Sequence, residues 1–119
     1  MNSFEKEFVI FVAESERSPL GQARRHFRFG EMNIYMRIGR RFYGGKVRPC
    51  LQIASLSTDE DHQRKGIFSR FLACVLGATK LPIFIEGVID PGFADALVRR
   101  GFVIVTDYNG FQTDLVLDR

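Results

Sequence analysis

The sequence predicts a single α/β (α+β) domain, residues 1–119, in which helices flank a mixed, mostly antiparallel sheet containing one βαβ unit. Its 119 residues suffice for one hydrophobic core and are too few for a second. Two strand-like runs, 32–42 and 46–57, are separated by the glycine pair 44–45, which supplies the positive φ values of a tight hairpin turn. A helical pattern over 67–76 separates the second run from a third at 81–89, which is the order of a βαβ unit.

The N-terminal segment predicts a strand followed by a loop. Residues 7–14, EFVIFVAE, form a short apolar run bounded by charges, which is typical of a strand. The next residues, 15–31, are polar and basic and are interrupted by Pro19 and Gly21. They predict a loop with at most one short helix over about 20–26.

The helix over 67–76 is predicted from apolar residues that recur four positions apart, and Gly77 is expected to end it. Residues 81–89, LPIFIEGVI, form a nearly continuous apolar run introduced by Pro82. Such a run is typical of a strand that is covered on both faces and paired parallel to a neighbour.

A second, shorter helix has both of its ends marked. Asp90 is the expected N-cap, Pro91 the first helical residue and Gly101 the stop. Residues 102–105 and 111–118 then predict two closing strands joined by a turn at 109–110.

Composition and charge argue against several classes of protein. The formal net charge of +3 and a pI near 9.1 are less basic than expected of a dedicated nucleic-acid binder. Cys50 and Cys74 are far apart and predict two reduced thiols, while the isolated His26 and His62 predict no metal site. Charged residues within the first apolar stretch argue against a signal peptide, and no segment could span a membrane, so a cytoplasmic location is expected.

An anion site is predicted where the helix over 67–76 begins. The first amide groups of a helix lack intrahelical partners and carry the positive end of its dipole. Gly66 lets a phosphate approach the backbone of Ile67 and Phe68, while Gln63, Arg64 and Lys65 supply further donors. The alternative is that Asp61 or His62 caps the helix and that the basic residues are solvated.

The surrounding stretch, LQIASLSTDEDHQRKGIFSRFL, is similar to the signature region of the GNAT (GCN5-related N-acetyltransferase) superfamily. In that family a strand is followed by a Q/R-x-x-G-x-G/A loop and a helix that hold the pyrophosphate of acetyl-CoA. Gln63, Gly66 and Phe68 stand at the three motif positions, with Phe68 in place of the small final residue. The resemblance continues through IFIEGVIDPGFADALVRRGF and covers about residues 51–105.

The resemblance implies a GNAT-like sheet and transfer of an acetyl group from acetyl-CoA to an amine of unidentified structure. It also implies that Leu56, Ser57 and Thr58 meet the pantetheine arm between two diverging strands. Many members place an acid, a tyrosine, four residues before the glycine of the closing Gly-Phe, where this sequence has Leu97.

Glu86 is the one carboxylate inside the otherwise apolar run 81–89 and is the candidate general base. The alternative is that Glu86 is a structural carboxylate paired with one of the many arginines. Tyr108 is a second candidate for reaching the site, although a tyrosine in a surface turn is the more common case.

Two further hypotheses remain at this point. The chain could be an acyl-CoA-binding or protein-binding module on the same fold without turnover, since Phe68 and Leu97 depart from the family pattern. It could also bind single-stranded nucleic acid through the basic and aromatic residues of 37–48, although a solvated hairpin explains them at least as well. A homodimer or a protein partner is compatible with the sequence.

Overall fold

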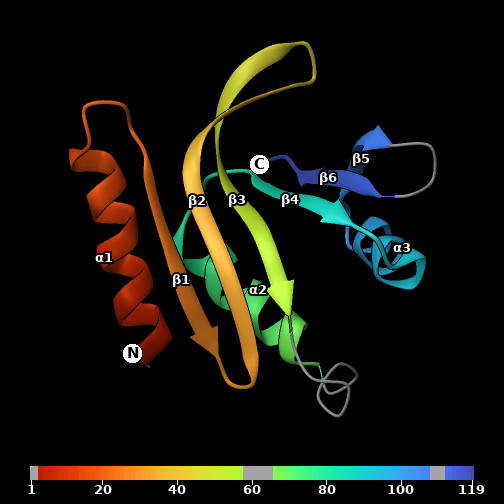
Figure 1. The fold of residues 1–119 in the computed structure, drawn as a ribbon, viewed down its shortest axis with the longest axis horizontal. Coiled ribbons are helices and arrows are strands. Elements are labelled where there is room, and N and C mark those ends of the chain that lie inside the picture. Colours follow the sequence, from red (N-terminus) through yellow and green to blue (C-terminus); the bar gives the residue numbers. More distant parts are fainter. Residues whose placement is uncertain (1–2, 58–65, 108–111) are drawn as a thin grey trace.

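The computed structural model describes residues 3–57, 66–107 and 112–119. Its elements are α1 (Ser3–Arg17), β1 (Ala23–Phe29), β2 (Met32–Tyr43), β3 (Lys46–Ser57), α2 (Ile67–Ala78), β4 (Ile83–Val88), α3 (Pro91–Arg99), β5 (Val103–Asp107) and β6 (Thr113–Leu117). The strands form one six-stranded sheet in the order β1-β2-β3-β4-β6-β5 (Figure 1). Only β3 and β4 pair in parallel among these strands, so the predicted mixed α/β fold with one βαβ unit is confirmed.

The strand predicted over 7–14 is wrong, because this segment belongs to helix α1. The buried residues of the helix are Phe4, Phe8, Phe11 and Ser15, whose spacing places them on one helical face. Val9 and Ile10 are about half exposed and complete an apolar run that looks like a strand when it is read without the preceding Phe4. The aromatic stripe, and not the length of the apolar run, decides the structure here.

The loop predicted over 15–31, with at most one short helix over about 20–26, is also wrong for most of its length, since residues 23–29 form strand β1. β1 pairs antiparallel with β2 from Ala23 opposite Ile38 to Phe29 opposite Met32. Its Phe27 packs edge-on against Phe4 and Phe11 of α1, with ring centroids 5.5 and 5.2 Å apart. Contacts with the rest of the protein therefore override the weak local signal of this basic segment.

The predicted hairpin is confirmed as β2 and β3, which turn at Gly44 and Gly45 with φ values of 61° and 83°. Helix α2 also forms as predicted, but it runs through Gly77 to Ala78 and ends at Thr79, whose amide donates to the carbonyl of Val75. Gly77 therefore does not end the helix.

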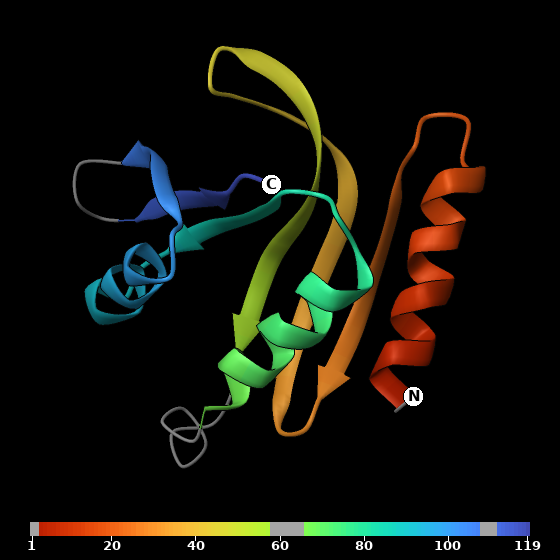
Figure 2. The same ribbon diagram turned by 180° about the vertical axis from the view of Figure 1, so that it is seen from behind.

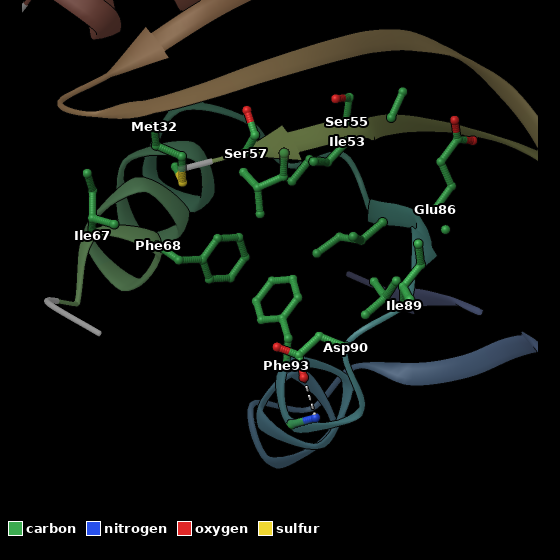
Figure 3. A pocket seen from close by; sticks show the side chains of 16 residues that line it. Met32, Ile53, Ser55, Ser57, Ile67, Phe68, Glu86, Ile89, Asp90 and Phe93 are labelled. Atoms are coloured by element: carbon green, nitrogen blue, oxygen red, sulfur yellow. Dashed lines mark hydrogen bonds between the residues drawn. The ribbon is translucent and has the colours of Figure 1, made fainter. Parts of the chain in front are cut away.

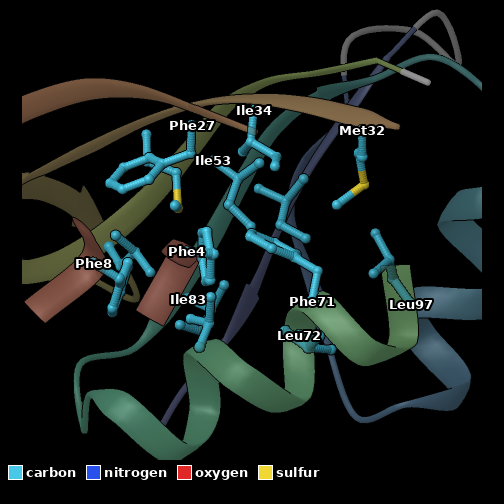
Figure 4. Packing of buried hydrophobic residues seen from close by; sticks show 14 of the residues in the cluster. Phe4, Phe8, Phe27, Met32, Ile34, Ile53, Phe71, Leu72, Ile83 and Leu97 are labelled. Atoms are coloured by element: carbon cyan, nitrogen blue, oxygen red, sulfur yellow. The ribbon is translucent and has the colours of Figure 1, made fainter. Parts of the chain in front are cut away.

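Helices α1 and α2 cover the same face of the sheet (Figure 2). Phe4 of α1 contacts Phe71 of α2, with ring centroids 5.6 Å apart. Figure 4 shows this core between α2 and the strands, with Ile34, Ile53 and Ile83 pointing toward the helix. A smaller apolar cluster lies on the opposite face of the sheet and consists of Tyr43, Cys50, Phe84 and Val116. β4 is therefore covered on both faces, as its sequence predicts.

Helix α3 begins and ends as predicted. The side chain of Asp90 accepts a hydrogen bond from the Gly92 amide at 2.9 Å, and Pro91 is the first helical residue. The two closing strands are confirmed as an antiparallel pair, and β6 inserts between β5 and β4. The turn predicted at 109–110 lies outside the described residues. None of the described helices is long and apolar enough to cross a membrane.

Candidate functional site

The site is a gap between the two parallel strands of the sheet. β3 and β4 pair from Leu51 opposite Ile83 to Ile53 opposite Ile85, and their pairing ends there. Both strands continue, β3 as far as Ser57 and β4 as far as Val88. Within the described residues, the edge of β3 that faces β4 is therefore without a strand partner beyond Ile53.

A bulge in β4 accompanies the end of the pairing. The register between β4 and β6 shifts between Ile85 and Val88, and Gly87 within the bulge has a φ of 69°. The Gly87 amide donates a hydrogen bond of 2.8 Å to Oδ1 of Asp114 on β6. Asp114 is only 3% exposed, so this carboxylate holds the bulge from inside the sheet. Glycine at this position permits a backbone conformation that other residues adopt at a cost.

The space between the diverging strands is a cleft of about 940 Å³ (Figure 3). Its walls come from the ends of β3 and β4 and from the beginnings of α2 and α3. Phe68 and Phe93 point toward one another, with ring centroids 5.0 Å apart and planes at 89°. This edge-to-face pair joins the first turns of α2 and α3 and gives the cleft an apolar wall.

The first turn of α2 lies at one end of the cleft. Gly66 is the N-cap residue and has a left-handed backbone, with φ 71° and ψ 15°. The first hydrogen bond of this turn runs from the Arg70 amide to the Gly66 carbonyl, at 3.1 Å. The amides of Ile67, Phe68 and Ser69 therefore have no intrahelical acceptor, and the helix dipole makes this end positive.

Basic side chains lie close to this turn. The guanidinium group of Arg100, at the C-terminus of α3, donates a hydrogen bond to the hydroxyl of Ser69. Among the described residues, a side chain at Gly66 would meet nothing closer than the Arg70 guanidinium, at 4.0 Å from the position of its Cβ. No described residue therefore fills the space beside Gly66.

Glu86 lines the cleft from β4 and is held by two arginines of β2. Arg37 Nη2 lies 2.6 Å from Oε1 and Arg41 Nη1 lies 2.5 Å from Oε2. The guanidinium of Arg41 also stacks over the Phe84 ring, 4.3 Å from its centroid. These contacts are the ion pairs of the alternative hypothesis for Glu86, and each carboxylate oxygen retains further lone pairs for a ligand in the cleft.

The structure brings five of the predicted site residues to the cleft: Leu56, Ser57, Ile67, Phe68 and Glu86. Gly66 is adjacent to them, whereas Thr58, Gln63, Arg64, Lys65 and Tyr108 lie outside the described residues. Leu97 is fully buried in the core and does not line the cleft.

Sequence reasoning missed Ser55 and Phe93, which also line the cleft. Ser55 lies two residues before Ser57 and so on the same side of an extended strand, a signal that the alternation of β3 contains. Phe93 lies in the first turn of α3, and no local signal in the sequence pairs it with Phe68.

The described residues contain no group of three or more His, Cys, Asp or Glu side chains that could hold a metal ion.

No protein-family model matches the chain, and no curated protein matches it. Two solved structures share its fold. One is a mutant of the toxin AtaT bound to the C-terminus of the antitoxin AtaR and acetyl-CoA, with 15% identity over 72% of this chain and a TM-score of 0.55. The other is the KacTA–DNA complex, with 16% identity over 98% of this chain and a TM-score of 0.56.

The chain spans 57% of the length of the AtaT chain and 81% of the length of the second chain. At this level of identity the comparison concerns the fold. Together with the strand order and the parallel pair that diverges, it shows that the chain has a GNAT-like fold.

Proposed function

We propose that the chain binds acetyl-CoA in the cleft between β3 and β4 and transfers the acetyl group to an amine. The observation that carries this proposal is the divergence of β3 from β4 with the start of α2 at the end of the gap. An AtaT mutant whose fold is similar was solved with acetyl-CoA, which supports the choice of ligand.

The free edge of β3 suits the pantetheine arm of acetyl-CoA. In the described part of the chain, the backbone groups of 54–57 that face β4 have no strand partner, and such groups are strong donors and acceptors. The two amides of pantetheine can pair with them as an added strand would. Leu56 and Ser57 are proposed to meet the arm on this edge, and Thr58, the next residue in the sequence, is proposed as a further contact.

The start of α2 suits the pyrophosphate. The amides of Ile67 and Phe68 and the positive end of the dipole attract an anion, and Gly66 leaves room for it. Gln63, Arg64 and Lys65 precede this turn in the sequence and are proposed as further donors to the phosphates.

The proposed chemistry is direct attack of the acceptor nitrogen on the thioester carbonyl carbon. The C–N bond forms, the C–S bond breaks, and the departing CoA thiolate takes up a proton. Glu86 is proposed to accept the proton that the amine loses, because it is the carboxylate on the β4 wall of the cleft. Leu97 cannot protonate the thiolate, so this proton is assigned to solvent or to Tyr108.

Calorimetry with acetyl-CoA and a transfer assay test the proposal. Acetyl-CoA should bind in the micromolar range, and Gly66→Asp should abolish binding because a carboxylate would then occupy the phosphate position. Gly45→Asp is the matched control, since Gly45 also has positive φ and open space but lies in the hairpin turn. Equal affinity of the Gly66→Asp and Gly45→Asp variants would refute the assignment of the phosphate site.

The second candidate is a module that binds acetyl-CoA without turnover. Two observations favour it, namely the two ion pairs of Glu86 and the buried Leu97 at the position of the family's acid. Release of free CoA thiol in the presence of a panel of amines separates the two candidates. Binding without thiol release above the buffer rate supports the silent module.

A further inference from the structure

We propose that Arg24, Arg37 and Arg41 bind an anionic group of the acceptor, so that the acceptor is a small amine that also carries a carboxylate or a phosphate. This inference rests on the proposed function and names the substrate class of the same site.

The three arginines share one face of the sheet. Arg37 alternates along β2 with Met36 and Ile38, whose side chains are buried beneath the helices. It therefore points to the opposite face, which is the one turned toward the viewer in Figure 1. Its guanidinium reaches across β3 to Glu86, which lines the cleft.

The positive charge of this cluster exceeds its negative charge. Two guanidinium groups share the single carboxylate of Glu86. Arg24 is the register partner of Arg37 across β1 and β2, so a third positive charge lies directly opposite the first. Like charges in this arrangement are destabilising, and a bound anion would relieve the repulsion.

Other acidic side chains near this face are already engaged. Glu31 pairs with Arg28 at 3.4 Å, and Asp118 pairs with Arg48 at 3.2 Å. No ion pair of Arg24 is found within the described residues. Among the described residues of this face, the uncompensated positive charge therefore lies beside Glu86.

The cluster also has hydrogen-bond donors without acceptors. A guanidinium carries five N–H groups in a planar fork that matches an oxyanion. Arg37 donates a hydrogen bond from Nη2 to Glu86. Its Nε is buried and has no hydrogen-bond partner in the described part of the chain. A buried donor without a partner costs stability, and an oxyanion would satisfy it.

Geometry limits the size of the acceptor. Arg37 and Arg41 both contact the carboxylate of Glu86, which lines the cleft. An amine at Glu86 and an anion on the arginines would therefore lie within a few bonds of one another. Amino acids and phosphoethanolamine have this arrangement, whereas polyamines and simple alkylamines lack the anion.

Paired substrates test the inference. The value of kcat/KM for acetylation is measured for two pairs of amines. Tyrosine carries a carboxylate that tyramine lacks, and O-phosphoethanolamine carries a phosphate that ethanolamine lacks. We expect the anionic member to be favoured roughly 10- to 100-fold in at least one pair, and the pair that responds identifies the carboxylate or the phosphate. Equal rates within both pairs, in a protein that acetylates amines, would overturn the inference and leave the proposed function intact.

Variants of the arginines test which side chains cause the preference for the anionic amine. Arg37→Gln and Arg41→Gln should bring the ratio of anionic to neutral amine close to one. Arg28→Gln is the matched control, because it removes the same charge from β1 at an exposed position already paired with Glu31, and it should keep the ratio. A ratio that survives both Arg37→Gln and Arg41→Gln would contradict the assignment.

A binding measurement keeps the inference testable if the protein does not turn over. The Nε–Hε signal of Arg37 is followed by NMR while O-phosphoethanolamine or glycine is added. A saturable shift in the wild type that is lost in Arg41→Gln is expected. The absence of a saturable shift with both probes would refute the anion site, whatever the outcome of acetyl-CoA binding.

Discussion

Replacing Asp114 tests how the cleft is kept open. Asp114→Ala removes the acceptor of the Gly87 amide, which donates at 2.8 Å from within the β4 bulge. An unsatisfied buried donor together with a lost charge-assisted hydrogen bond should destabilise the fold by about 2–3 kcal/mol. For a domain of this size the loss corresponds to a melting temperature lower by roughly 8–12 °C.

The released bulge should also weaken ligand binding, because β4 can then pair further along β3 and narrow the gap. We expect acetyl-CoA affinity to fall about tenfold, which corresponds to a loss of about 1.4 kcal/mol in binding free energy. Thermal unfolding by circular dichroism measures the first effect, and calorimetry well below the transition measures the second.

Asp114→Asn is the control for this experiment, since an amide oxygen of the same size can still accept from Gly87. It should retain more stability and more affinity than Asp114→Ala. If Asp114→Ala unfolds at the wild-type temperature and binds acetyl-CoA normally, the bulge does not depend on this hydrogen bond and the explanation of the cleft is wrong.

Three further predictions concern the walls of the cleft and the two thiols. Phe68→Ala removes one ring of the edge-to-face pair and should cost about 2–3 kcal/mol in unfolding free energy, since Phe68 is only partly buried; unchanged stability with tighter acetyl-CoA binding would show instead that Phe68 obstructs the phosphates. Glu86→Gln should lower the turnover rate about 10²- to 10⁴-fold and leave acetyl-CoA affinity nearly unchanged, whereas full turnover would make Glu86 structural. Desolvation raises the pKa of the fully buried Cys50 to about 11, so at pH 8 its thiol stays protonated and a thiol reagent should modify Cys74 first; equal rates for both cysteines would contradict the burial of Cys50.

Elements with strong local signals could be predicted from the sequence. The hairpin follows from the positive φ values that Gly44 and Gly45 supply, and α3 follows from the cap at Asp90. The nearly continuous apolar run 81–89 predicts β4 and its parallel pairing, because a strand that is covered on both faces is apolar on both sides. These signals are contained within a few neighbouring residues.

Other features depend on contacts between distant residues. Glu86 and Arg37 are 49 positions apart, and neither residue predicts the other without the sheet order. The strand β1 is stabilised by aromatic contacts with α1, whose residues 7–14 look like a strand in the sequence. The bulge at Gly87 needs the carboxylate of Asp114 from a strand that inserts out of sequence order.

The central claim is that acetyl-CoA lies between β3 and β4 with its phosphates at the start of α2. A ¹H–¹⁵N correlation spectrum recorded during an acetyl-CoA titration tests this placement most directly. The largest saturable shifts are predicted for the amides of Ser55, Leu56 and Ser57 and of Ile67 and Phe68. Saturable shifts that instead concentrate in the hairpin residues 40–49, or no saturable shift at all, would contradict the account.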